Sequence, residues 1–135
     1  MALRQLVEEM HHRLAAAGHP DLRPAHGYVL NAVGPDGTTT VRLAEVLGMT
    51  KQGAAKLTGS LVERGYLIAV DDPSDGRARL LRLTERGSDM LVLAAGIQAD
   101  LETELTAIAG ADDTAALRRV LQVMADPGAP LRPVW

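Results

Sequence analysis

The chain has 135 residues, 47% of them apolar but only 2% aromatic, so any core must be built from Leu, Ala, Val, Ile and Met. This length fits one domain with a modest core, or two chains that share a core. The absence of cysteine excludes disulfides and thiol redox sensing, and no apolar run approaches the ~18 residues that suggest a membrane span. The net charge of −3 is uneven, because residues 50–87 carry 7 basic and 5 acidic side chains whereas residues 88–126 carry 2 and 7.

The first predicted helix covers residues 3–17, where apolar side chains recur at helical spacing. Gly18 and Pro20 end it. The N-terminal stretch lacks the apolar centre and the cleavage site of a signal peptide, so we expect a cytoplasmic protein. A second helix is predicted from Pro24, because proline fits the first turn of a helix. It stops before a turn at residues 34–37, after which residues 38–40 could add a short strand to a hairpin further along.

Two short helices then meet at residues 48–50. Gly48 can end the first of them in the left-handed conformation, and Thr50 is a good N-cap for the second. At about 100° per residue, one side of the second helix is predicted to face a core. That side carries Ala54, Leu57, Thr58 and Leu61.

The opposite side of the second helix carries one long amide, one long cation and several very small residues. Gln and Lys side chains can reach base edges or phosphates, and small neighbours let a helix backbone sit close to a groove. By itself this face fits a solvated helix surface equally well. Its residues are Gln52, Lys56, Gly59 and Glu63, flanked by Gly53, Ala55 and Ser60.

A strand–turn–strand pattern follows, with strands at residues 67–70 and 79–83 and turn formers at residues 72–76. Arg77, Arg79 and Arg82 come directly after the turn, and an arginine at a hairpin tip suits the negative potential of a narrow minor groove. Taken alone, this is an ordinary charged turn. A helix, a tight turn, a second helix and a basic hairpin in this order predict a winged helix-turn-helix, which places its second helix in a DNA major groove.

The stretch LAEVLGMTKQGAAKLTGSLVERGYL, followed by DDPSDGRARLLRLTERG, resembles the MarR family of bacterial transcriptional regulators. Members of that family end the recognition helix with a run like LVERGYL and carry a D-x-R wing before an L-T-x-x-G helix start. The resemblance covers residues 24–87 closely and the rest by layout. It implies an entwined homodimer that binds pseudo-palindromic operator DNA, as a repressor, and is often released by a small aromatic ligand.

The resemblance also implies a candidate site. The chain departs from the commoner pattern at Gly53 and Ala55, where many members place hydroxylated residues. The family's first two helices help to line a ligand pocket, which makes His12, His26 and Tyr28 candidates for it, although each could equally be a surface or packing residue. The candidate DNA-binding residues are Lys51, Gln52, Gly53, Ala55, Lys56 and Ser60 on the helix and Arg77 and Arg79 on the wing.

After the wing, Thr84 can cap a long helix whose apolar residues recur from Met90 to Ile108. From residue 85 to residue 109 such a helix is about 37 Å long, which is hard to bury against a small winged domain. The apolar side of this helix is therefore predicted to pack against a partner chain. Gly110 ends it, and Asp112 can cap a last helix.

The expected fold is mainly α with a small β-hairpin wing, in a single domain spanning residues 1–135. Within it, residues 22–84 form the DNA-binding part, residues 1–20 and 85–126 form the helical dimerisation part, and residues 127–135 form a tail.

Catalysis and metal binding are not expected. Adjacent His11 and His12 point about 100° apart on a helix, so they cannot both face one metal. No nucleophile is paired with a base in a recognisable motif, and no glycine-rich phosphate loop follows a strand. We therefore expect a protein that is not an enzyme and needs no cofactor. The alternative function is a winged-helix module for protein–protein contact without sequence-specific DNA binding, which would leave the basic wing unexplained.

Overall fold

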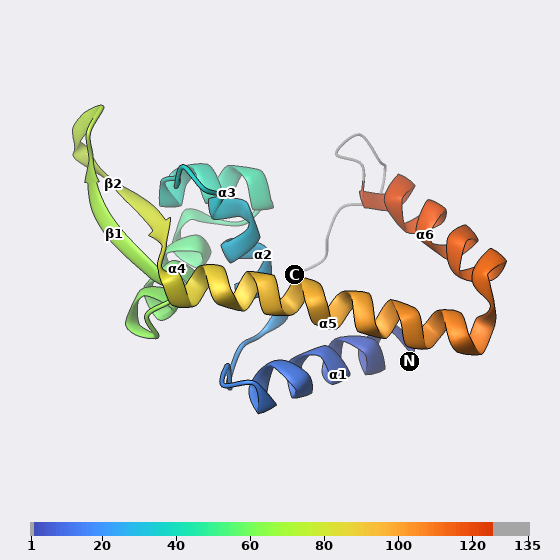
Figure 1. The fold of residues 1–135 in the computed structure, drawn as a ribbon. Helices are drawn as coiled ribbons and strands as arrows, with labels where there is room; N and C mark the ends of the chain where they lie inside the picture. Colours follow the sequence, from blue (N-terminus) through green and yellow to red (C-terminus); the bar gives the residue numbers. More distant parts are fainter. Residues whose placement is uncertain (1, 126–135) are drawn as a thin grey trace. The chain divides into compact units, whose positions relative to one another are not determined.

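The computed structural model describes residues 2–125 (Figure 1), so the predicted tail at residues 127–135 lies outside the described residues. The predicted fold class, mainly α with a small hairpin, is confirmed. Close contacts divide the chain into a unit that ends at Ala95 and a second unit that begins at Gly96. The elements are α1 (Ala2–Ala16), α2 (Pro24–Val33), α3 (Thr40–Leu47), α4 (Lys51–Glu63), β1 (Leu67–Asp72), β2 (Asp75–Leu83), α5 (Glu85–Ala109) and α6 (Ala111–Ala125).

Helices α2, α3 and α4 pack on one another in the first unit (Figure 1). Burial of each large aliphatic side chain contributes about 1.5–3 kcal/mol, so this small helical core is the main source of local stability. Its fully or nearly fully buried side chains are Val29, Leu30, Val33, Leu43, Ala44, Ala54 and Leu61.

The caps of α3 and α4 determine where the tight turn lies. Thr39 caps α3 by accepting a hydrogen bond from the Arg42 amide at 3.2 Å. Gly48 ends α3 in the left-handed region at φ 64°, as predicted. Thr50 then caps α4 by accepting from the Gly53 amide at 3.0 Å, also as predicted. Only two residues, Gly48 and Met49, therefore separate α3 from the cap of α4.

Strands β1 and β2 form an antiparallel hairpin whose register runs from the pair Leu67 and Leu83 to the pair Asp72 and Asp75. Both strands extend further toward the tip than predicted, because the loop between them holds only two residues. The expected extra strand at residues 38–40 is a single bridge, in which Thr38 and Leu81 exchange backbone hydrogen bonds of 3.0 and 2.7 Å.

The end of the hairpin is joined firmly to the start of α5. Thr84 caps α5 by accepting from the Gly87 amide at 3.1 Å, and its hydroxyl donates to the Gly65 carbonyl at 2.6 Å. The Thr84 amide also donates to the Tyr66 carbonyl at 3.1 Å. A Cβ at Gly87 would lie 2.2 Å from that same carbonyl oxygen, so only glycine fits. These contacts explain why a threonine at position 84 is followed by a glycine at position 87.

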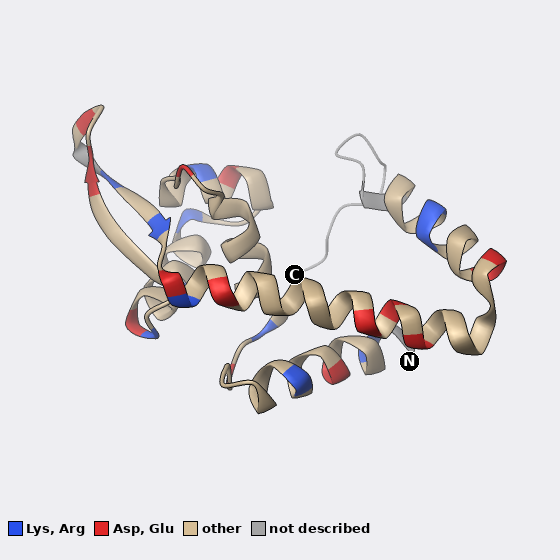
Figure 2. Cartoon of the chain, in the orientation of Figure 1, with Lys and Arg blue, Asp and Glu red and all other residues tan. Residues whose placement is uncertain are grey.

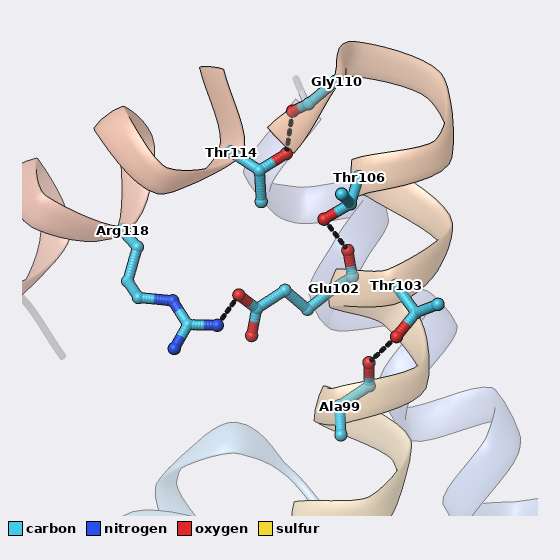
Figure 3. Close-up of polar contacts among 7 residues, drawn as sticks. All are labelled: Ala99, Glu102, Thr103, Thr106, Gly110, Thr114 and Arg118. Carbon is cyan, nitrogen blue, oxygen red and sulfur yellow. Dashed lines mark hydrogen bonds and ion pairs between the residues drawn. The ribbon is translucent and has the colours of Figure 1, made fainter. Parts of the chain in front are cut away.

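In the second unit, the C-terminal part of α5 and helix α6 are linked by an ion pair between Glu102 and Arg118 (Figure 3). Gly110 lies between the helices at φ 91°, and the Thr114 amide and hydroxyl both contact its carbonyl. Helix α6 starts at Ala111, directly after Gly110. The prediction that Asp112 caps α6 was wrong, because Asp112 lies inside the first turn of the helix. Its negative charge there still interacts favourably with the helix dipole.

Candidate nucleic-acid interface

Helix α4 presents its predicted outward side to solvent. Ala54, Thr58 and Leu61 are buried on the inner side, at 0–4% exposure, and Leu57 is half-buried. These residues fix the rotation of α4 about its own axis, because they lie one turn apart on a single face. The candidate DNA-binding residues Lys51, Gln52, Ala55 and Lys56 are exposed, and Gly53 and Ser60 are partly exposed.

The structure explains why a glycine stands at position 53, which the sequence alone did not indicate. Its amide donates to the Thr50 hydroxyl, and a Cβ at this position would lie 3.1 Å from that oxygen. A larger residue here would press on the capping hydroxyl. Together with Ala55 and Gly59, Gly53 leaves the N-terminal and central turns of α4 with little side-chain volume around Gln52 and Lys56.

The wing is held at its tip by one carboxylate. One oxygen of Asp72 accepts from the Ser74 hydroxyl at 2.6 Å and from the Ser74 amide at 2.8 Å. The hydroxyl bond, and then the amide bond, hold the pKa of Asp72 below its ordinary value of 3.8, against a small opposing effect of desolvation. The carboxylate therefore fixes the shape of the two-residue loop.

The two candidate wing arginines lie two residues apart on β2. Arg77 belongs to β2, in the third position after Ser74, but its side chain lies outside the described residues. Arg79 lies along the hairpin, where its guanidinium donates to the Ala69 carbonyl at 3.0 Å. Arg79 therefore braces β1 as well as carrying a charge. Figure 2 shows acidic residues on the hairpin too, near the tip.

Sequence reasoning missed a cluster at the end of α4. Tyr66, the last of the three residues between α4 and β1, is 1% exposed. Its hydroxyl lies 2.9 Å from Nδ1 of His19 and accepts from the Arg86 guanidinium at 3.2 Å. That guanidinium lies 4.8 Å from the centre of the Tyr66 ring and also donates to the Gly18 carbonyl at 3.2 Å. No local pattern could reveal this cluster, because His19 and Tyr66 are 47 residues apart.

A second arginine joins the same two regions. Arg64, at the C-cap of α4, donates to the Asp21 carbonyl at 3.0 Å. Asp21 has φ 62°, a left-handed conformation in the loop between α1 and α2. Arginines on both sides of Tyr66 thus hold carbonyls of this loop.

The three candidate ligand-pocket residues differ in exposure, and none of them lines the hollow described next. His12 is exposed, Tyr28 is 47% exposed, and His26 is buried. Nδ1 of His26 accepts from the Arg23 amide at 3.1 Å. This hydrogen bond caps the start of α2, where the N-cap residue is Arg23. Burial, followed by the nearby charges of Arg64, Arg23 and His11, lowers the pKa of His26 from 6.5.

An open hollow of about 480 Å³ lies instead between α1 and the residues that lead into α2. Its lining combines charged and apolar side chains, and none of the three candidate residues is part of it. The lining residues are Arg4, Val7, Glu8, His11, Leu22, Arg23 and Pro24.

Two features are absent from residues 2–125. No group of three or more His, Asp or Glu side chains in this range is arranged to hold a metal ion. Over the same range, no helix is long and apolar enough to cross a membrane.

Comparison with known proteins places this arrangement in a family. Residues 21–78 match the model of the MarR family. The HTH-type transcriptional regulator PetP of Rhodobacter capsulatus is 33% identical over 94 residues, which are 67% of this chain and 55% of PetP. The chain thus aligns with only about half the length of that relative.

Solved structures agree over most of the chain. The transcriptional repressor CouR, solved bound to a 23-mer DNA duplex, is 29% identical with a TM-score of 0.73, over 92% of this chain and 87% of CouR. The PcaV transcriptional regulator of Streptomyces coelicolor, solved in complex with its natural ligand, is 28% identical with a TM-score of 0.61, over 93% of this chain and 90% of PcaV. With the capped helix pair, the hairpin and the matched residues taken together, the chain belongs to the MarR family of winged helix-turn-helix regulators.

Proposed function

We propose that this chain is a transcriptional repressor that binds pseudo-palindromic operator DNA as a homodimer and is modulated by a small-molecule ligand. The exposed face of α4 is the observation that carries the proposal. It combines two lysines and one glutamine with small neighbours, on a helix whose opposite side is locked into a core. The DNA duplex bound in the CouR structure supports the same use of the fold here.

The division of labour follows from side-chain chemistry. Lys51 lies at the N-terminus of α4, where its charge and the backbone amides favour a phosphate. Gln52 and Lys56 are long enough to reach base edges in the major groove, since glutamine can pair with adenine and lysine with guanine. Arg77 is assigned to the minor groove, and Arg79 to the phosphates beside it.

A homodimer would present two copies of α4 to one face of the DNA, about 34 Å apart. We assign residues 22–84 to DNA binding and residues 1–20 and 85–126 to dimerisation. The exposed apolar side chains of α6 support this assignment, since a partner chain would remove them from water. A cytoplasmic location and the absence of catalysis remain predictions from the sequence.

The ligand would act by favouring a dimer geometry in which the two recognition helices no longer match successive grooves. The structure of PcaV in complex with its natural ligand supports the binding of a small molecule by this fold. The hollow beside α1 is the cavity that we assign to a small aromatic effector, with the Arg23 side chain able to meet an acidic group on it. His12, His26 and Tyr28 remain candidates for such a site only if a partner chain completes it.

Selection of bound sequences from random DNA tests the proposal most directly. We expect a two-fold symmetric site, which would report both dimerisation and base readout. Binding that is insensitive to salt and shows no sequence preference would support the protein–protein module instead, because phosphate neutralisation makes DNA binding strongly salt-dependent.

Two variants divide the interface further. Arg77→Ala should weaken binding to the selected site, and unchanged affinity at moderate salt would reject a role for this wing residue. Gln52→Ala should change the preferred sequence more than the overall affinity, whereas a uniform loss across sequences would reassign Gln52 to phosphate contact.

A further inference from the structure

The loop between α1 and α2 is fastened to the joint between the recognition helix and the wing. Tyr66 is that joint, because it follows the last residues of α4 and precedes β1. Its amide donates to the Leu61 carbonyl at 2.9 Å and its carbonyl accepts from the Thr84 amide. Its backbone is thus held by α4 and by the start of α5, and its side chain is held by the loop.

The direction of the hydrogen bonds at the Tyr66 hydroxyl can be deduced. The hydroxyl oxygen accepts from the Arg86 guanidinium, which has only donors. Tyr66 is 1% exposed, so its hydroxyl proton needs an acceptor within the protein. Nδ1 of His19, at 2.9 Å, is the acceptor that the described contacts provide. His19 must therefore be neutral, with its proton on Nε2.

We propose that His19, Tyr66 and Arg86 form a proton-sensitive latch, which holds the α1–α2 loop on the joint between recognition helix and wing while His19 is neutral and releases it when His19 is protonated. A proton on Nδ1 would remove the acceptor of the Tyr66 hydroxyl proton, which the described contacts do not otherwise satisfy. It would also place a second positive charge beside the Arg86 guanidinium.

The surroundings of His19 mainly favour its neutral form, as the latch requires. Burial lowers the pKa of His19 from 6.5, and the Arg86 charge lowers it further, while Asp89 opposes them. Arg86 and Asp89 come from α5, and Tyr66 comes from the joint itself. The neutral, latched form is therefore favoured at neutral pH, and the latch opens only on acidification.

The consequence for DNA rests on the proposed function. Acidification adds positive charge, which by itself strengthens attraction to phosphates. Release of the loop would loosen the end of α4 and the base of the wing, which weakens binding. The latch therefore predicts an effect of opposite sign to simple electrostatics.

The first test follows the free protein by NMR from about pH 8 to about pH 5, the range in which histidine titrates. We expect His19 to titrate below 6.5 with Nε2 protonated in the neutral form, and the amide signals of Gly18, Gly65 and Tyr66 to shift with the same midpoint. Tyr66→Phe keeps the ring but removes the hydroxyl, so the Gly65 amide should no longer follow His19. Arg86→Gln should raise the midpoint, and Asp89→Asn should lower it.

The second test measures DNA affinity at constant ionic strength over the same pH range. Relative to Tyr66→Phe, the unmodified protein should lose affinity by up to about tenfold per pH unit below the His19 midpoint. Asp89→Asn is the matched control, because it keeps all three latch residues, and its loss of affinity should follow its own, lower His19 midpoint.

A proton on Nδ1 of the neutral ring, amides at Gly65 and Tyr66 that ignore the His19 midpoint, or the same pH response in Tyr66→Phe would each overturn the latch. If neither protein binds DNA at any pH, the proposed function fails, and the NMR titration still decides whether the latch exists.

Discussion

Gly87 lies in the first turn of α5, against the backbone of Tyr66. A Cβ at this position would lie 2.2 Å from the Tyr66 carbonyl oxygen and 3.3 Å from Leu83. The carbonyl oxygen cannot move away cheaply, because it accepts the hydrogen bond from the Thr84 amide. Gly87→Ala should therefore lower the free energy of unfolding by about 2–3 kcal/mol through overpacking. Urea unfolding of both proteins measures this difference.

Gly59→Ala is the matched control. Gly59 lies in the interior of α4, and apart from its chain neighbours and the backbone of its own helix no described atom lies within 4 Å of the place where its Cβ would be. Alanine here should raise stability by about 1 kcal/mol, because glycine is the poorer helix former. A Gly87→Ala protein as stable as Gly59→Ala would show that the first turn of α5 is not closely packed against Tyr66.

His26 makes stability depend on pH. Its folded-state pKa is lowered, chiefly by burial, so below 6.5 the unfolded chain binds the proton more readily. Stability should be complete above about pH 6.5. It should then fall as the pH drops toward the folded-state pKa of His26. His26→Gln keeps an acceptor for the Arg23 amide but cannot titrate.

The free energies of unfolding of the two proteins should therefore diverge as the pH falls from about 7.5 to about 5.5. Chemical unfolding at each pH measures the divergence. Parallel curves would mean that His26 is exposed to solvent in solution and does not contribute to acid sensitivity.

At the scale of elements, the turn of the wing depends on one serine. Ser74→Ala removes the hydroxyl that makes the largest contribution to lowering the pKa of Asp72. We expect this pKa to rise toward 3.8 in Ser74→Ala and to stay low in Ser74→Thr, as read from carboxyl carbon signals in NMR. Because the pKa is depressed in the folded hairpin, the Asp72 contacts stabilise it above 3.8 and are lost as the pH falls through the folded-state value. If the pKa of Asp72 were the same in Ser74→Ala and Ser74→Thr, the hydroxyl would not be the cause of the lowered pKa.

The sequence predicted best what local chemistry decides. Gly48, Thr50 and Thr84 end or cap helices through contacts within a few residues, and all three lie where they were expected. The strand ends were less well predicted, because pairing between β1 and β2 extends the hairpin past residues that look like turn formers. The predicted cap of α6 at Asp112 was wrong, since the helix already starts at Ala111, directly after Gly110.

The candidate site shows the same limit. Helical spacing was sufficient to predict which side of α4 is exposed. It could not show that Arg79 contacts the Ala69 carbonyl, because that contact depends on the register of the hairpin. The cluster around Tyr66 was out of reach for the same reason, since it joins three segments that are distant in the sequence.

At the scale of the whole molecule, the charge is divided between the two functions that we propose. The stretch from residue 50 to residue 87 carries a surplus of only +2, whereas residues 88–126 carry −5. Attraction to phosphates depends on the local field, so the acidic helices need not prevent DNA binding. So small a surplus predicts modest affinity, with sequence readout by α4 supplying much of the preference for an operator.

The exposed apolar side of α6 leads to the last prediction. Leu117, Val120 and Leu121 lie at i, i+3 and i+4 on one face, and each is about half-exposed in the single chain. If a second copy covers this face, Val120→Glu would bury a carboxylate without a partner, which is costly. The dimer dissociation constant should then rise at least about tenfold, equivalent to about 1.4 kcal/mol. Analytical ultracentrifugation over a dilution series measures it.

Gln122→Glu adds the same charge to the same helix but on another side, so it separates the effect of position from that of charge. Gln122→Glu should dimerise like the unmodified protein. It should also keep its affinity for the selected DNA, whereas Val120→Glu should lose affinity in proportion to its loss of dimer, because one recognition helix alone gives up half of the contacts. If Val120→Glu stays as dimeric as Gln122→Glu, the partner chain does not cover α6, and another surface must join the two copies.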